Sequence, residues 1–379
     1  ENLGVRPLPN LETKFVAANT LIGIEKPAQM LLRNPGIDKK EEELKKVRER
    51  HFTARTPQTK EKYRKADEKL RAEISELLKK DGFPSETTEK LAKWNPYDQN
   101  AHADFFDSEW MFGISDGFDV VIGNPPYLES RHASFSETLK ETYQSEVKKR
   151  WHSLSANITK GADLLIYFFE SAISFINNSG IITYITQNSW LNSDYGKKFQ
   201  LFLLKTTNVH AIIDSDFKYF DSKEGPNINT VISIFIGNKV KPGSKVMFAR
   251  YHDDFQGIPF SFREAEKLAE YNLAEVKEYK CTDEQITEIK WGILLSSEDF
   301  VLNLLEILKE KAVYLDKLSD VNFKIGQGLN LSKEYIVSRD FAHSFMHAAI
   351  PFVTSEDGAP YVLNSTANYI LDKNKLSKG

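Results

Sequence analysis

The stretch Phe118-Asp-Val-Val-Ile-Gly123, followed at once by Asn124-Pro-Pro-Tyr127, decides how this chain of 379 residues is organised. The first part is rich in Val and Ile, which is typical of a buried strand. The two prolines have no backbone N–H and hold φ at about −65°, so they cannot continue a sheet ladder. The sequence therefore predicts a strand that ends in a stiff turn, with an amide and an aromatic ring held at its end.

Three further apolar runs, residues 180–186, 209–214 and 230–236, have the same β-branched character. Residues 163–177 lie between the first two strands, are apolar on most sides and are long enough for a buried helix. Strands that alternate with helices in this way indicate an α/β sheet covered on both faces. The last two strands have no helix between them, so we expect them to run antiparallel.

The composition of the chain excludes several classes of protein. Hydrophobic residues make up 41% and charged residues 27%, which excludes a wholly disordered chain. The net charge of −4 excludes a uniformly basic coat on nucleic acid, although a local basic patch remains open. A single cysteine, Cys281, predicts no disulfide and no zinc cluster, and no metal site is expected. The apolar run 164–169 is far shorter than a membrane span, so no membrane partner is expected.

Residues 26–116 form a charged segment with a helical pattern. Between residues 38 and 80 there are 15 Lys and Arg against 10 Asp and Glu, and apolar residues recur at spacings of three and four. Pro57 divides this pattern, which favours a helical hairpin. The simplest interpretation is a solvated insertion, and the alternative is an arm that lies near a phosphate backbone. The tetrapeptide Trp94-Asn-Pro-Tyr97 follows a charged helix rather than a strand, so we interpret it as a loop.

Residues 124–127, called the 124–127 turn below, suit one kind of chemistry. Ligands of open α/β sheets bind at the carboxyl ends of the strands, where this turn is expected. The Asn124 side-chain oxygen and the Pro125 carbonyl could accept both N–H groups of an exocyclic amine and so favour a pyramidal nitrogen. Tyr127 could stack on the planar substrate and set the angle of attack. The turn therefore points to methyl transfer to an adenine or amide nitrogen, and the alternative is a purely structural turn.

These motifs resemble the amino-methyltransferases that use S-adenosylmethionine, whose signature is Asn/Asp-Pro-Pro-Tyr/Phe. The match is closer to the adenine-N6 DNA methyltransferases with a C-terminal target-recognition domain, and among them to the methylase portion of type IIG restriction–modification enzymes. Besides the 124–127 turn, the stretches that carry the resemblance are residues 6–11, 18–21, 105–113 and Thr186-Gln-Asn-Ser-Trp190. The resemblance implies a Rossmann-like class I methyltransferase sheet in a bacterial or archaeal cytoplasmic protein.

The resemblance also implies roles for single residues. Asn124, Pro125, Pro126 and Tyr127 would form the catalytic loop. Asn19 and Thr20, together with Asn124, would contact the cofactor. Phe220 would stack on the extruded adenine opposite Tyr127. Extrusion costs a few kcal/mol, and stacking returns ~1–3 kcal/mol per base face. The alternative for Phe220 is an ordinary core aromatic.

Residues 323–333 fit the glycine-bearing start of the family's recognition region. The polar side chains there that could read base edges or bind phosphates are those of Lys324, Gln327, Asn330 and Lys333. The alternative is an ordinary hairpin. We expect five parts: an N-terminal piece of the methyltransferase sheet (1–25), the helical insertion (26–116), the catalytic core (117–240), a helical connection (241–320) and the start of the recognition domain (321–379).

The family's glycine-rich S-adenosylmethionine loop is not found in this sequence. We therefore expect an incomplete sheet, an unpaired edge on the 118–123 strand, and a fragment that binds cofactor weakly without upstream residues. Those residues, together with a nuclease domain and double-stranded DNA, are the expected partners. Adenine-N6 methylation in a restriction–modification system is the first functional hypothesis. The alternatives are a protein glutamine N-methyltransferase and a catalytically inactive DNA-binding or assembly fragment.

Overall fold

The computed structural model divides into two compact units, residues 1–303 and 304–379. In the first unit the structure describes residues 8–26, 34–98, 100–215, 229–237, 244–251, 273–281, 283–296 and 302. In the second unit it describes short strands between residues 336 and 371. No helix among the described residues is long and apolar enough to cross a membrane.

The predicted helical hairpin forms and turns at Pro57. Helix α1 covers Pro35–Thr53 and α2 covers Pro57–Lys80. Asn34 caps α1 by accepting a hydrogen bond from the Gly36 N–H, and Thr56 forms a capping box with Thr59 at the start of α2. Two short helices follow, α3 (Ser85–Lys93) and α4 (Ser108–Phe112), and the 94–97 tetrapeptide lies in the loop between them, as expected.

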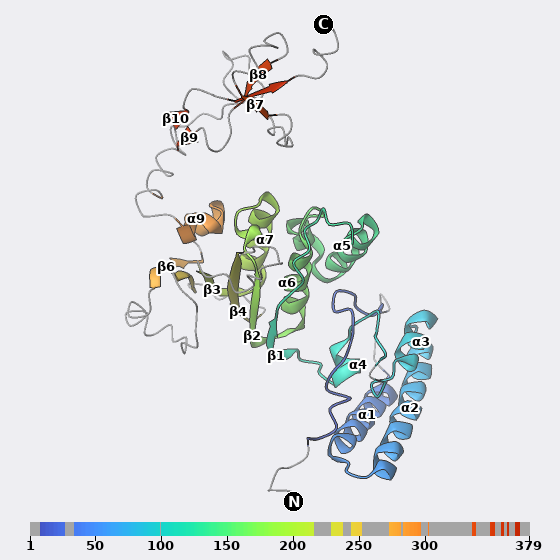
Figure 1. Ribbon diagram of the computed structural model, residues 1–379. Helices are drawn as coiled ribbons and strands as arrows, with labels where there is room; N and C mark the ends of the chain where they lie inside the picture. The colour runs from blue at the N-terminus through green and yellow to red at the C-terminus, as the bar shows by residue number, and fades with distance from the viewer. Residues whose placement is uncertain are drawn as a thin grey trace, which may run out of the picture. The chain divides into compact units, whose positions relative to one another are not determined.

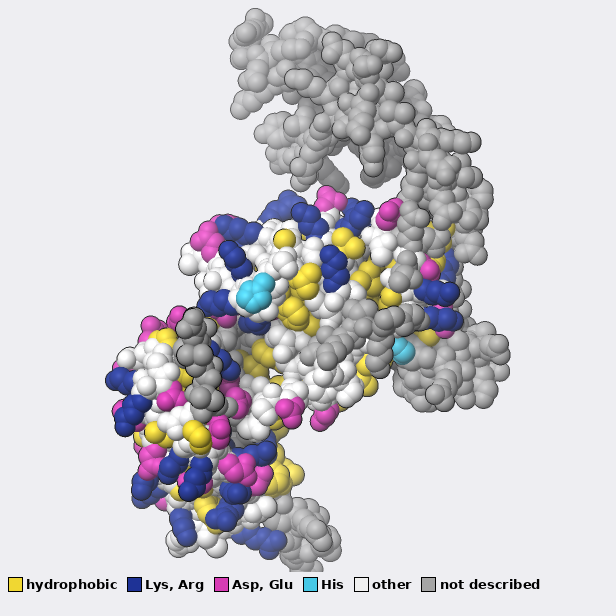
Figure 2. Space-filling view, turned by 180° about the vertical axis from the view of Figure 1, so that it is seen from behind, with side chains coloured by type: hydrophobic (Ala, Val, Ile, Leu, Met, Phe, Trp, Pro, Cys, Tyr) yellow, Lys and Arg dark blue, Asp and Glu magenta, His cyan; other side chains and the backbone are white. Residues whose placement is uncertain are grey.

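The helical insertion has an apolar core of its own, built around Ile37, Ile74 and Trp110. Its surface is mixed rather than basic, because Lys and Arg side chains alternate with Asp and Glu over the helices (Figure 2). Several of these charges form ion pairs, such as that of Lys40 with Glu73 at 2.7 Å. This surface favours the solvated insertion over an arm that binds phosphates.

A six-stranded mixed sheet forms the body of the first unit (Figure 1). The strand order is β1-β2-β4-β3-β5-β6. The strands are β1 (Phe118–Gly123), β2 (Ile176–Gln187), β3 (Asn208–Ser215), β4 (Thr230–Ile236), β5 (Lys245–Tyr251) and β6 (Leu273–Lys280). β1 pairs with β2 in parallel, whereas β3 and β4 pair antiparallel as predicted. The carboxyl ends of β1 and β2 therefore meet at one edge of the sheet.

Helices cover one face of this sheet and share its main core. They are α5 (Glu137–Trp151), α6 (Leu164–Phe175), α7 (Asp194–Thr206), α8 (Glu284–Glu288) and α9 (Trp291–Ser296), with 3-10 turns at His152–Asn157 and Ser189–Leu191. On the opposite face the core cluster consists of strand residues, such as Ala211 and Met247. Within the part of the chain that the structure describes, no helix joins that second cluster, so cover on both faces stays a prediction.

The N-terminal segment differs from the expected sheet piece. Residues 12–14 form a turn, and Ala18 makes one isolated parallel bridge to Ala103. Phe15 is 73% exposed, whereas Val16 and Ala18 are half-buried against the core of the insertion, so the run 14–18 packs on the insertion rather than in the sheet. Residues 17–22 instead follow residues 103–106, where the Asn19 N–H donates to the Ala103 carbonyl at 2.9 Å.

The second unit contains two small antiparallel sheets. Its strands are β7 (Ile336–Ser338), β8 (Ala349–Phe352), β9 (Gly358–Ala359), β10 (Val362–Leu363) and β11 (Asn368–Leu371). Lys324, Gln327, Asn330 and Lys333 lie outside the described residues, so their contact with DNA stays a prediction.

Candidate functional site

The 124–127 turn leaves the sheet at the carboxyl end of β1. Gly123, the last residue of β1, pairs with Tyr184 of β2. A Cβ atom on Gly123 would lie 3.0 Å from Cε1 of the Tyr184 ring, so the glycine lets the backbone rest against that ring. Beyond it Pro125 is buried, Tyr127 is half-buried, and Asn124 and Pro126 are exposed. The turn thus presents the Asn124 carboxamide to solvent from a rigid base.

A pocket of about 450 Å³ lies beside this turn. Asn124 and Pro125 line it together with Thr20, so the structure brings together residues that are far apart in the sequence. Most of the other lining groups are apolar, including the rings of Phe106, Phe118, Phe168, Phe175 and Tyr184. Asn19 is not among the lining residues, and its side-chain oxygen accepts a hydrogen bond from the Leu21 N–H at 3.1 Å, so its contact with the cofactor stays a prediction. Asn19 therefore holds the turn that carries Thr20.

The far end of the turn is fastened to the start of α6. The Leu164 N–H donates to the Leu128 carbonyl at 3.0 Å, and the Ser130 N–H donates to Oδ1 of Asp163 at 2.9 Å. Sequence reasoning missed Asp163. The only local signal is an acidic residue directly before an apolar helix, which alone indicates no more than a helix start.

Burial keeps the aromatic hydroxyls of the site neutral. It raises the pKa of the Tyr127 phenol to about 12 and raises that of Tyr184 further. Both rings are uncharged at physiological pH, as ordinary tyrosines are, and burial keeps them so into more alkaline solution. A neutral Tyr127 ring suits stacking on a planar base.

The outer edge of β1 has no partner strand among the described residues, as the sequence predicted. Val120 is 60% exposed and Ile122 is 79% exposed. Ile181, which pairs with Val120 in the register of β1 and β2, is 42% exposed. An apolar strip therefore follows the edge that leads to Asn124.

The described residues fit one side of a nucleoside-sized cofactor. Thr20 and Asn124 supply polar groups to the 450 Å³ pocket, and its aromatic walls suit a flat ring. Gly123 is the only glycine that lines the pocket, so no glycine-rich loop borders it among the described residues. These residues could border one side of a flat ligand, and those that the structure describes do not enclose a cofactor.

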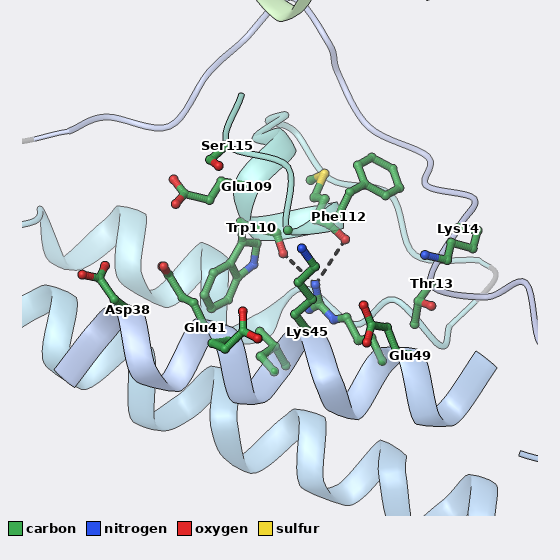
Figure 3. Close-up of a pocket in the computed structure, with 15 residues that line it drawn as sticks. Thr13, Lys14, Asp38, Glu41, Lys45, Glu49, Glu109, Trp110, Phe112 and Ser115 are labelled. Atoms are coloured by element: carbon green, nitrogen blue, oxygen red, sulfur yellow. Dashed lines mark hydrogen bonds between the residues drawn. The ribbon is translucent and has the colours of Figure 1, made fainter. Parts of the chain in front are cut away.

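A different pocket, of about 280 Å³, lies in the insertion between α1 and α4 (Figure 3). Acidic side chains line much of it: Asp38, Glu41, Glu42, Glu49 and Glu109. Arg48 donates from Nη1 to the carbonyls of Trp110 and Met111, at 2.7 and 3.2 Å, and so fastens α4 to α1. None of the predicted site residues lines this pocket. No group of three or more His, Cys, Asp or Glu among the described residues could hold a metal ion.

Comparison with known proteins identifies the family. The chain matches the Eco57I restriction-modification methylase family over residues 17–220, more than half of its length, and belongs to that family. Its mixed sheet with flanking helices is the expected class I methyltransferase fold.

Individual relatives match over shorter stretches. The type II methyltransferase M.BstVI of Geobacillus stearothermophilus is 28% identical over 97 residues, which are 26% of this chain and 16% of that protein. The release factor glutamine methyltransferase of Haemophilus influenzae is 26% identical over 102 residues, 26% of this chain and 31% of that protein. The type IIG restriction endonuclease BpuSI superposes with a TM-score of 0.37 and 12% identity, covering 92% of this chain and 43% of that one. The matched stretches of M.BstVI and of the release factor glutamine methyltransferase each span under a third of that protein.

Proposed function

We propose that this chain supplies the catalytic part of an S-adenosylmethionine-dependent DNA methyltransferase that modifies the exocyclic N6 of an adenine flipped out of a duplex. The observation that carries this proposal is the position of Asn124, at the carboxyl end of β1 and on the rim of a pocket with aromatic walls. Membership of a restriction-modification methylase family supports it.

The residues of the turn act on the amine. The Asn124 side-chain oxygen and the Pro125 carbonyl accept its two N–H groups, which concentrates the lone pair on the nitrogen. Bound S-adenosylmethionine supplies the methyl group. Tyr127 stacks on one face of the base, and Phe220, which lies outside the described residues, is proposed for the other. Positive charge develops on the nitrogen during attack, and the two acceptors stabilise it without a strong base.

The remaining cofactor contacts are proposed to come from polypeptide outside this chain. The exposed edge of β1 next to Asn124 can accept another strand. That polypeptide is proposed to be the upstream part of a longer enzyme that includes a nuclease domain. The proposed substrate is double-stranded DNA, and the proposed location is a bacterial or archaeal cytoplasm. The division of the chain into five parts also remains a proposal.

Methyl transfer from labelled S-adenosylmethionine to an adenine-containing duplex tests the proposal, in the full-length protein and in this chain alone. Asn124→Ala should lower the rate by ~10²–10³-fold, the usual effect of removing one transition-state hydrogen bond. Its affinity for the duplex should change little. Equal loss of affinity and rate would mean that the turn has a structural role.

Phe220→Ala tests the stacking assignment. With 2-aminopurine at the target position, the variant should show less of the fluorescence increase that accompanies base extrusion. Unchanged fluorescence would contradict this assignment and leave that of Asn124 intact.

A protein glutamine methyltransferase is the second candidate. Similarity to the release factor glutamine methyltransferase favours it, because an amide nitrogen also needs two acceptors. Label found in a protein glutamine rather than in adenine would support this candidate. Label transferred only by the full-length protein would show that this chain acts as a binding or assembly fragment when it is alone.

A further inference from the structure

Asp163 is a buried carboxylate that none of the proposed chemical steps uses. It precedes α6, and only 7% of its surface is exposed. Oδ1 accepts a hydrogen bond from the Ser130 N–H at 2.9 Å. Oδ2 accepts hydrogen bonds from Gln187 Nε2 at 3.0 Å, Tyr195 Oη at 2.5 Å and Ser189 Oγ at 3.3 Å. Four donors thus converge on one side chain.

The four donors come from the two segments that leave the sheet side by side. Ser130 lies three residues after Tyr127, on the continuation of the 124–127 turn. Gln187 ends β2, and Ser189 and Tyr195 follow it. Because β1 and β2 are parallel neighbours, Asp163 links the segment after one strand to the segment after the other.

A carboxylate is needed to satisfy this arrangement. A buried charge is tolerated only when hydrogen bonds replace the water that it loses, and here all four partners can donate. Burial, and then the hydrogen bond to Asp163, raise the pKa of the Tyr195 phenol, so this hydroxyl keeps its proton and remains a donor. An amide at position 163 would turn one acceptor into a donor: towards Ser130 it would face a backbone N–H, and on the other side Gln187, Ser189 and Tyr195 would have to turn and accept instead.

On the far side of the 124–127 turn, the segment that follows it is held by the hydrogen bond from the Ser130 N–H to Asp163 and by that from the Leu164 N–H to the Leu128 carbonyl. On its near side β1 holds it through the pairing of Gly123 with Tyr184. The two prolines stiffen the turn but cannot donate hydrogen bonds to its surroundings. The position of Tyr127 relative to Asn124 therefore depends on where residues 128–130 are held.

We propose that Asp163 is a positioning residue for methyl transfer: it fixes the segment after the 124–127 turn against the segment after β2, so that Asn124 and Tyr127 meet the acceptor amine in a reactive geometry. This assignment rests on the proposed function. Asp163 does not line the pocket beside Asn124, and it acts on the turn through the Ser130 N–H.

The test uses the full-length protein with Asp163→Asn, and with Glu170→Gln as a matched control. Glu170 lies on α6, the helix that Asp163 precedes, is fully buried, and accepts hydrogen bonds from Arg150 and Trp151, neither of which belongs to the site. Three quantities are measured: the single-turnover rate of methyl transfer to the duplex, the dissociation constant of the duplex, and hydrogen exchange of the amides in residues 128–131.

Asp163→Asn should slow single turnover by ~10–100-fold, because a misplacement of about 1 Å can reduce a rate ~100-fold. The duplex dissociation constant should stay within about two-fold, since binding energy common to ground and transition states is kept. Exchange of the Ser130 amide should accelerate. Glu170→Gln should lower the melting temperature without changing the single-turnover rate or the exchange of residues 128–131.

Tyr195→Phe is the second variant, because it keeps the ring and the Ser130 bond and removes one donor. It should slow single turnover less than Asp163→Asn does. Unchanged rate and exchange in Asp163→Asn, or equal slowing in Glu170→Gln, would overturn the proposal. A wild-type protein without methyl transfer would overturn the proposed function instead. In that case, unchanged hydrogen exchange of the Ser130 amide in Asp163→Asn would still contradict the claim that Asp163 holds the segment after the 124–127 turn.

Discussion

Asp67→Ala should lower the free energy of unfolding of the helical insertion more than a substitution on its surface does. Asp67 lies on α2 with no exposed surface. Its Oδ2 accepts from Arg48 Nε of α1 at 2.8 Å, and its Oδ1 accepts from Arg71 Nε at 2.7 Å. The Tyr97 hydroxyl donates to Oδ2 at 3.3 Å. One carboxylate therefore neutralises two guanidinium groups that are less than 10% exposed.

The size of the effect follows from what remains after the substitution. Breaking a buried ion pair by removing one partner costs about 3–5 kcal/mol, because the other charge stays buried. Arg48 would keep its bonds to the carbonyls of Trp110 and Met111, and Arg71 would keep those to Ala92 and Trp94. These contacts place the expected loss of unfolding free energy near the lower end, about 3 kcal/mol, which is a large share of the 5–15 kcal/mol typical of a domain.

Urea unfolding followed by tryptophan fluorescence measures this loss, since Trp94 and Trp110 belong to the same core. Glu61→Gln is the control, because its ion pair with Lys65 is 57% exposed on the acidic side, and its unfolding midpoint should stay unchanged. A loss below about 1 kcal/mol for Asp67→Ala would refute the reasoning, because it would mean that the two guanidinium groups find water or other partners.

Three further predictions concern single side chains. Ile122→Asp should reduce self-association in sedimentation experiments at high protein concentration without changing the melting temperature, because Ile122 is 79% exposed on the edge of β1. Unchanged association would mean that this edge strand does not mediate self-association. Burial raises the pKa of Tyr127 to about 12, so the stability that its neutral phenol contributes is complete below pH ~10 and is lost as the pH rises through the folded-state value; a Tyr127→Phe variant that loses as much stability there would contradict this. Burial lowers the pKa of His51, so its contribution is present above pH ~6.5 and is lost as the pH falls through the folded-state pKa; the acid limb of an unfolding titration should therefore flatten in His51→Phe.

Local patterns predicted the parts of the fold that depend on neighbours in sequence. Pro57 separates α1 from α2 because proline cannot continue a helix, and the Val- and Ile-rich run before Asn124 forms β1, although β1 lies at the edge of the sheet and is not buried as predicted. Residues 14–18, within the expected N-terminal piece of the sheet, form no strand, because Ala18 alone makes a bridge to another segment. Residues 17–22 find a partner in the insertion rather than in the sheet.

The site was predictable only in part. Asn124 could be singled out because a proline corner after a strand is visible in the sequence, and Thr20, named from the family resemblance, lines the same pocket. Asp163 could not be singled out, because its four donors lie 24 to 33 residues away along the chain and follow no periodic pattern. Phe220 and the polar residues between 324 and 333 lie outside the described residues and remain predictions.

The place of β1 at the margin of the sheet has a consequence for thermal behaviour. An edge strand is hydrogen-bonded along one side only, so its local unfolding costs less free energy than that of a central strand. Asn124 begins where this strand stops, so fraying there would misalign the proline corner while β3, β4 and β5 stay paired. On warming, the 124–127 turn would therefore become disordered reversibly at a lower temperature than that at which the rest of the sheet unfolds.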